Sequence, residues 1–364
     1  MTSDNFAGGG GSLRLPQSAG LDIVELDESH LPDATRLFAD DYRRLRRTVP
    51  ALPAAYLDGS AILTALGRLL AAGPSGAALP AVAALRGGKL TGFMAGLAIP
   101  GLRGSGTAAY VPEWAHAATG RDRAATFAAL YGAVSARWLE RGWLTHCCSI
   151  LADDRELRDE LSWLGFGLFV VDALRGIDST SAAMPVAAAI GPSNPPRGTT
   201  ISRATAADLD ELLELDVASD AYYSAAPTFL HRDVDGEPRA ALASRLTTTG
   251  QSVWIARSGS RIVSCLYMRS PGEDVTRLVR DAGTISICGA FTVPEARGSG
   301  LAGALLGAVA GWARDSGYER ISVDFESANL LAGRFWLRRF DPICLSFERH
   351  LDDRLAPANA AVRP

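Results

Sequence analysis

The segment with the clearest chemistry is Arg297-Gly298-Ser299-Gly300-Leu301-Ala302, which joins a strand-like stretch to a helix-like one. The first turn of a helix presents unpaired N–H groups and a partial positive charge, so it favours anions. Glycines just before such a turn let the backbone approach the anion closely. This loop therefore predicts a binding site for a phosphate or pyrophosphate group.

Two common phosphate loops do not fit this pattern. No Lys-Ser/Thr pair follows the glycines, as the loop of nucleoside-triphosphate-binding proteins requires. The spacing also lacks the third glycine of the dinucleotide fingerprint G-x-G-x-x-G.

The loop resembles the pyrophosphate loop of the GNAT superfamily of acyl-CoA-dependent N-acyltransferases, whose pattern is Q/R-x-x-G-x-G/A. Downstream, Asn329, Ala332, Phe335 and Trp336 match the N-x-x-A-x-x-F-Y/W run of that superfamily. The resemblance extends over residues 284–338, in the order strand, loop, helix, strand and Asn-containing helix.

The resemblance implies a fold, a cosubstrate and a set of contacts. The expected fold is α/β, with a mixed, mostly antiparallel sheet flanked by helices. Acetyl-CoA would enter between two central strands, and a small-molecule amine would attack its thioester directly. The implied cofactor-binding residues are Phe291, Thr292, Val293, Arg297, Gly298, Ser299, Gly300, Leu301, Ala302, Asn329 and Phe335. No metal-ligand spacing accompanies them.

The groups that would move protons are harder to identify. Many members of the superfamily place a tyrosine where this chain has Trp336, and an indole N–H is a poor acid. Ser286 and Cys288 share one face of the strand before the loop and are the catalytic candidates. An ordinary buried strand would also have small residues at these positions. Water is the alternative group that could remove the proton from the amine. Asp324 and Glu326 share one face of the next strand. Solvent-exposed or helix-capping positions would explain these two carboxylates as well as a role in the site.

An acceptor site is expected in the first helix–loop–helix of the C-terminal half, over 216–236. Tyr222, Tyr223 and His231 are the substrate-binding candidates, and Phe229 and two aspartates lie among them. Aromatic rings with carboxylates suit an organic cation, although an ordinary polar loop would have the same composition.

The elements around these residues occur twice. Trp138 and Trp312 recur about 174 residues apart, as do Trp163 and Trp336, so the chain reads as two tandem GNAT-like units. The four tryptophans are expected in the cores. The predicted divisions are a disordered tail 1–20, a degenerate GNAT-like domain 21–176, a linker 177–198, a cofactor-binding domain 199–352 and a tail 353–364. This layout is similar, in architecture only, to tandem GNAT enzymes such as mycothiol synthases.

The N-terminal unit is expected to bind the cofactor weakly or not at all. Arg123-Ala-Ala-Thr-Phe-Ala128 occupies the place of the glycine loop, with both glycines replaced. A second string that fits the loop pattern, 103–108, precedes strand-like residues, so a plain loop is expected there.

The composition narrows the class of protein and its expected location. The net charge of -4 argues against a general nucleic-acid binder. Five cysteines without C-x-x-C spacing suggest reduced thiols and a cytoplasmic location. No stretch is long and apolar enough for a transmembrane helix. Abundant alanine and a single lysine suggest an actinobacterium-like source. Exposed strand edges in this fold are compatible with a homodimer.

The sequence thus predicts an acetyl-CoA-dependent N-acetyltransferase that acts on a small-molecule amine through its C-terminal half. One alternative is a non-catalytic acyl-CoA-binding or regulatory protein. Another is an acyltransferase that uses a different acyl group or acceptor. The acceptor itself, the acyl-chain preference and the oligomeric state are not encoded in any motif.

Overall fold

The computed structural model describes residues 20–71, 80–102, 106–177, 195–231, 237–272 and 275–357. Residues 1–19 and 358–364 of the predicted tails, most of the predicted linker and the aspartates of 232–236 lie outside these residues, whereas 353–355 of the predicted C-terminal tail form a short 3-10 helix.

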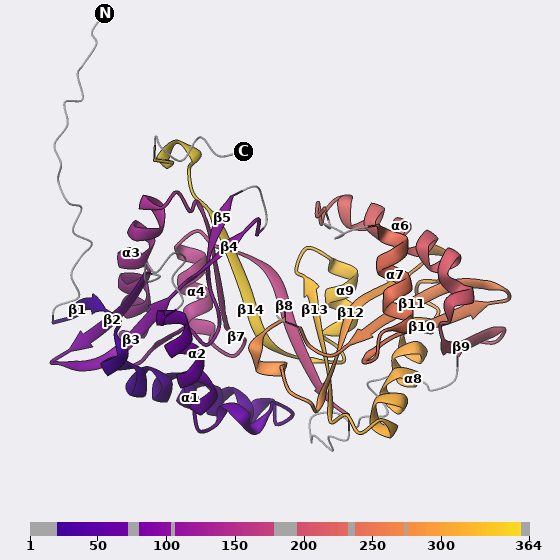
Figure 1. The fold of residues 1–364 in the computed structure, drawn as a ribbon, viewed down its shortest axis with the longest axis horizontal. Helices are drawn as coiled ribbons and strands as arrows, with labels where there is room; N and C mark the ends of the chain where they lie inside the picture. Colours follow the sequence, from indigo (N-terminus) through magenta and orange to yellow (C-terminus); the bar gives the residue numbers. More distant parts are fainter. Residues whose placement is uncertain are drawn as a thin grey trace, which may run out of the picture.

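The N-terminal half alternates strands and helices much as the sequence predicts (Figure 1). Its helices are α1 (Leu31–Thr48), α2 (Ser60–Ala71), α3 (Arg123–Glu140) and α4 (Arg155–Trp163). Its strands are β1 (Asp22–Glu25), β2 (Ala81–Arg86), β3 (Lys89–Ala95), β4 (Leu97–Pro100), β5 (Thr107–Val111), β6 (His116–Ala118), β7 (Thr145–Leu151) and β8 (Gly167–Gly176).

The C-terminal half repeats this order. Its helices are α6 (Leu209–Ser224), α7 (Pro238–Thr247), α8 (Leu301–Asp315) and α9 (Leu330–Trp336). Its strands are β9 (Thr199–Arg203), β10 (Gln251–Ser258), β11 (Arg261–Arg269), β12 (Thr284–Thr292), β13 (Arg320–Glu326) and β14 (Asp341–His350).

The predicted α/β class and the mixed, mostly antiparallel sheets are confirmed. Only two of the described strand pairs are parallel, β5 with β7 and β12 with β13. They occupy matching places in the two halves. β7 and β13 begin at Thr145 and Arg320, and α3 and α8 end at Glu140 and Asp315, so both pairs are 175 residues apart (320 − 145 and 315 − 140). The chain is therefore a tandem of one fold.

The two halves share one sheet, which the sequence reading did not anticipate. Ten strands run in the order β4-β5-β7-β14-β8-β13-β12-β11-β10-β9, and β1-β2-β3-β6 form a separate sheet. The last strand of each half lies beside the second-last strand of the other: β14 pairs with β7, and β8 pairs with β13. β8 and β14 also pair with each other at the middle of the sheet (Figure 1). This exchange joins the halves through backbone hydrogen bonds.

Helices cover both faces of the C-terminal part of the sheet. α8 and α9 pack on one face over Ile285 and Ile321, while α6 and α7 pack on the other over Ile255 and Phe291. Among the repeated tryptophans, Trp138 and Trp336 are buried as expected. The expectation is wrong for Trp163, which is 89 % exposed at the end of α4.

Candidate functional site

The two central strands of the C-terminal half separate partway along their length. β12 and β13 pair from Thr284 with Arg320 to Ile287 with Val323. Both strands then continue, β12 pairing with β11 to Thr292 and β13 pairing with β8 to Glu326. Beyond Ile287 and Val323 the facing edges of the two strands no longer bond to each other. The space between these separated strand ends is called the opening below.

The separation has a local cause in β12. The register between β11 and β12 shifts so that Met268 faces Ile287 and Tyr267 faces Gly289, which leaves Cys288 as the extra residue of a bulge. Such a bulge bends its strand. Gly289 is required here, because a Cβ would lie 2.8 Å from Cδ2 of Tyr267. Past this bend, Ala290 is exposed even though it belongs to an interior strand.

The end of β12 turns part of its backbone toward the opening. The N–H of Val293 donates to the carbonyl of Val263 at 3.0 Å, so this residue pairs with β11. Because antiparallel residues alternate in the direction of their N–H and C=O groups, Ala290 and Thr292 point theirs away from β11. Phe291 is buried against α6 and α7, while the Thr292 hydroxyl lies 2.8 Å from that of Ser264.

The glycine loop leads directly from this strand end into α8. Gly298 and Gly300 have φ angles of 76° and 85°, in the left-handed region that favours glycine. A Cβ at either position would meet no heavy atom within 4 Å, so glycine is favoured here by its backbone conformation rather than by crowding. Ser299 donates its hydroxyl to the carbonyl of Ala296 at 2.6 Å, and buried Leu301 anchors the helix start.

The first turn of α8 has no side-chain cap. Gly300 is the N-cap residue, and its carbonyl accepts the first helical hydrogen bond, from Ala304. The N–H groups of the preceding residues, including Ala302, belong to the turn that a helix leaves without internal acceptors. This arrangement suits an anion, as the sequence predicts.

Arg297 connects the loop to the opening. Its Nε donates to the Thr292 carbonyl at 3.0 Å. Its guanidinium carbon lies 4.8 Å from the centre of the Tyr222 ring and 5.8 Å from that of Phe291.

Asn329 lies on the other side of the opening, just after β13. It is buried, and its Oδ1 caps α9 by accepting the N–H of Ala332 at 3.1 Å. The same oxygen accepts the hydroxyl of Tyr222 at 3.3 Å. Tyr222 thus links α6 to the start of α9. Phe335 belongs to α9, and the centre of its ring lies 4.7 Å from that of Trp336.

The two catalytic candidates differ in position. Ser286 is 1 % exposed in the paired part of β12, and its Oγ lies 2.6 Å from that of Ser322. It therefore does not face the opening. Cys288 is partly exposed at the bulge where the strands separate, with its thiol donating to the Tyr267 carbonyl at 3.5 Å.

Three carboxyl groups lie near the opening on the side of the N-terminal half. Asp324 is exposed one residue beyond the last parallel pair and faces Asp172 of β8 in the antiparallel register. Glu113 is buried and accepts the Thr276 hydroxyl at 2.7 Å. Burial, followed by the charges of Asp324 and Glu113, raises the pKa of Asp172 well above its usual range. Sequence reasoning missed Asp172 and Glu113, because no local pattern brings 113, 172 and 324 together.

The acceptor candidates lie at and after the end of α6. The Tyr223 carbonyl accepts the N–H of Leu230 at 2.9 Å, which folds the following loop back onto the helix. Within that loop Phe229 is 75 % exposed and has a φ of 49°, a strained value for a residue with a Cβ. His231 is exposed at the end of the loop.

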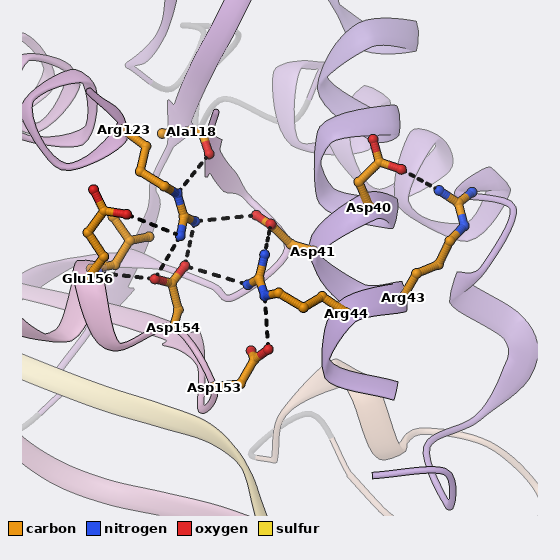
Figure 2. A network of polar contacts seen from close by, with 10 residues as sticks. Asp40, Asp41, Arg43, Arg44, Ala118, Arg123, Asp153, Asp154 and Glu156 are labelled. Carbon is orange, nitrogen blue, oxygen red and sulfur yellow. Dashed lines mark hydrogen bonds and ion pairs between the residues drawn. The ribbon is translucent and has the colours of Figure 1, made fainter. Parts of the chain in front are cut away.

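The N-terminal half fills the matching position with its own side chains. α3 and α8 begin 178 residues apart, at Arg123 and Leu301, whereas they end 175 apart. α3 therefore has almost one extra turn where the C-terminal half has its loop. Figure 2 shows the Arg123 guanidinium directed at Asp154, to which it bonds through both Nη atoms at 3.0 and 2.6 Å. Asp41 and Glu156 lie within 3.8 Å of the same guanidinium.

The opening of that half is filled as well. Nε2 of His116 lies 2.8 Å from the carbonyl of Ser149 and so joins β6 to β7. Burial lowers the pKa of His116, which favours the neutral ring. The loop before β12 enters the N-terminal core, where Val275 and Leu278 are buried, and the Tyr56 hydroxyl donates to the Arg277 carbonyl at 2.6 Å. The expectation that this half binds the cofactor weakly or not at all stays a prediction.

The second string that fits the loop pattern lies at a hairpin. Residues 103–105 are outside the described residues, but β4 and β5 pair on either side of them. The residues that follow form a strand, so no helix start is present there.

The described ranges contain no cluster of three or more His, Cys, Asp or Glu side chains that could hold a metal ion. None of their helices is long and apolar enough to cross a membrane.

Comparison with known proteins agrees with this geometry. Residues 218–341 match the model of the acetyltransferase (GNAT) family. No curated protein has a significant sequence match to the chain.

Two solved structures have a similar fold. A GCN5-related N-acetyltransferase from Sphaerobacter thermophilus has a TM-score of 0.54 at 13 % identity, over 93 % of this chain and 97 % of its own. The glucosamine N-acetyltransferase region of a fungal multi-domain β-N-acetylglucosaminidase has a TM-score of 0.50 at 11 % identity, over 90 % of this chain and 38 % of its own. At these identities the likeness concerns the fold. Together with the match of residues 218–341 and the internal repeat, it shows that the C-terminal half carries a GNAT acetyltransferase domain and that the chain has a tandem GNAT-like fold.

Proposed function

We propose that this protein transfers an acetyl group from acetyl-CoA to a small-molecule amine at the opening between β12 and β13. The observation that carries the proposal is the end of the parallel pairing at Ile287 and Val323, next to the uncapped start of α8. A chain of amides fits between strands whose edges have separated, and a diphosphate fits the start of a helix.

Several residues around the opening support acetyl-CoA as the donor. The backbone groups of Ala290 and Thr292 would pair with the pantetheine amides, and the loop from Arg297 to Ala302 would hold the diphosphate. The thioester would then lie near Cys288 and Asn329, where the strands begin to diverge. An N–H of β12 would polarise its carbonyl.

The acceptor is proposed to be a primary amine that approaches from the α6 side. The carboxylate of Asp324, exposed beyond the last paired residues, would attract the protonated amine before it loses a proton to water. Tyr223, Phe229 and His231 would contact the rest of the acceptor. The amine nitrogen would then attack the thioester carbon directly, and CoA would leave as the thiol.

Calorimetric titration of acetyl-CoA tests the cofactor part. We expect one site per chain and a loss of roughly tenfold or more in affinity for Gly300→Glu, since a carboxylate would repel the diphosphate. Gly317→Glu is the matched control, because Gly317 has a φ of 84° and equally open surroundings at the other end of α8. If both variants bind as wild type does, the loop is not the site.

Release of free CoA in the presence of a panel of primary amines tests the transfer. The main rival is an acyl-CoA-binding protein without activity, which buried Trp336 and sequestered Ser286 favour. Binding of acetyl-CoA without CoA release from any amine would support that rival.

A further inference from the structure

Acyl transfer needs a proton for the departing thiolate, and neither Trp336 nor Ser286 supplies one at the opening. Trp336 occupies the position of the usual tyrosine, but it is 4 % exposed and packs between Phe335 and Phe340, at ring distances of 4.7 and 5.4 Å. The Ser286 hydroxyl pairs with Ser322 away from the opening. The superfamily position therefore supplies no proton donor in this chain.

Tyr222 brings a phenol to the same place from a different element. It lies near the C-terminal end of α6 and contacts three separate parts of the site. Its hydroxyl donates to Asn329 at the start of α9, its ring meets Phe291 of β12 at 6.5 Å, and the Arg297 guanidinium covers the ring at 4.8 Å.

These three contacts locate the hydroxyl. Phe291 is the second-last residue of the strand on one side of the opening, Asn329 follows the strand on the other side, and Arg297 begins the glycine loop. A group that touches all three lies across the opening, where an acyl donor held by β12 and the loop would present its sulfur. The 3.3 Å bond to Asn329 is long for an O–H···O hydrogen bond, so exchanging it for another acceptor costs little.

We propose that Tyr222 donates the proton that the leaving thiolate of acetyl-CoA takes up, an inference that rests on the proposed function. The amine nitrogen forms the new C–N bond with its lone pair, and the C–S bond breaks with its electron pair on sulfur. The phenolic proton moves to that sulfur and yields CoA-SH. The phenolate regains a proton from water, and the nitrogen loses its extra proton to water, so the step balances.

Asn329 is a positioning residue in this scheme. Its side chain is fixed by the Ala332 N–H, so its oxygen gives the Tyr222 hydroxyl one defined direction before the donor binds. Arg297 has a second role in the scheme. Because it bonds to the strand end and covers the Tyr222 ring, it holds the phenol against the same loop that binds the diphosphate.

The test compares Tyr222→Phe with Tyr318→Phe in the full chain. Tyr318 follows the far end of α8, with its ring 5.8 Å from that of Trp312, and both substitutions remove one hydroxyl. With acetyl-CoA and the best amine of the panel, Tyr222→Phe should lower kcat roughly a hundredfold, the usual scale for a lost general acid. Tyr318→Phe should leave kcat unchanged.

Acetyl-seleno-CoA, in which selenium replaces the reacting sulfur, separates proton donation from other roles. Selenolate leaves without a proton at neutral pH, so Tyr222→Phe should then cost less than about threefold in kcat. An equal loss with both donors would show that Tyr222 acts through the structure and would overturn the proposal. So would a large loss of acetyl-CoA affinity by calorimetry.

Turnover by the wild-type protein separates failure of the proposed function from failure of the role of Tyr222. Absence of turnover in the wild type would remove the proposed function, and the role of Tyr222 with it. Turnover by wild type and an unaffected Tyr222→Phe variant would remove the role of Tyr222 alone.

Discussion

The guanidinium of Arg123 and the carboxylate of Asp154 form a two-pronged ion pair at the first turn of α3, with N–O distances of 3.0 and 2.6 Å. In the C-terminal half the matching arginine, Arg297, lies on an aromatic ring instead and has no such carboxylate pair among the described ion pairs. The proposal of a single anion site per chain rests on this difference.

Asp154→Asn should destabilise the protein strongly. Asp154 is 5 % exposed, and its replacement removes the nearest of the carboxylates around Arg123, which costs about 2–4 kcal/mol for a mostly buried pair. Urea unfolding should show this loss, whereas Asp159→Asn, whose side chain is 70 % exposed, should change the free energy of unfolding little. Neither variant should gain a second acetyl-CoA site. Equal stability of the two variants would contradict the importance of the pair.

Asp172 should make stability depend on pH. Its pKa is raised in the folded state by burial first and then by Asp324 and Glu113, while the backbone N–H of Thr276 and the charge of Arg280 act in the opposite direction. The folded protein therefore binds a proton that the unfolded chain has already lost. Stability should fall as the pH rises from the unfolded pKa, near 3.9, through the raised folded pKa, by up to about 1.4 kcal/mol per pH unit.

Asp172→Asn removes this dependence. The amide oxygen keeps the hydrogen bond from Thr276 without a charge, so the variant should be more stable than wild type near pH 7 and should show a flatter pH profile. Buried Cys344 belongs to the same cluster, with its pKa raised by burial and then by the charges of Glu113 and Asp172. Thermal unfolding between pH 5 and 8 measures the difference, with Asp159→Asn as the control. A parallel profile for wild type and Asp172→Asn would assign the dependence to other groups.

Phe229 should lower the stability of the folded protein while its ring contacts the acceptor. Its φ of 49° is costly for any residue with a Cβ, and its ring is 75 % exposed, so the ring contributes little burial. Phe229→Gly should stabilise the protein by about 1 kcal/mol, while Phe229→Ala keeps the strained backbone and should not. Both should raise KM for the amine if the ring contacts it. An unchanged KM in both variants would remove Phe229 from the acceptor site.

The local chemistry of the site was readable from the sequence, because it depends on adjacent residues. The run from Arg297 to Ala302 encodes a turn and a helix start within six positions, and the structure has both. Asn329 was likewise marked by its place before a helix, which it caps. Side-chain type and spacing determine such features directly.

The long-range arrangement was not readable. A strand such as β8 is recognised by its apolar residues, but these do not specify whether its neighbour is β7 or β13. That choice depends on packing between segments more than 100 residues apart, such as Val171 with Phe325. The same applies to Glu113 and Asp172, which meet through this packing. Trp163 failed as a core prediction because its match to Trp336 was one of sequence alone, without a neighbour to cover it.

Trp336→Tyr tests whether the residue usual in the superfamily would restore an ordinary proton donor. Trp336 is 4 % exposed and packs between two phenylalanine rings in the α8–α9 core, so a tyrosine there would bury its hydroxyl and leave a void. We expect a loss of about 1–3 kcal/mol in the free energy of unfolding and no rise in kcat. The double variant Tyr222→Phe/Trp336→Tyr should remain as slow as Tyr222→Phe alone, measured by CoA release. Recovery of activity in the double variant would mean that position 336 reaches the sulfur, and that the proton donor has not moved to α6.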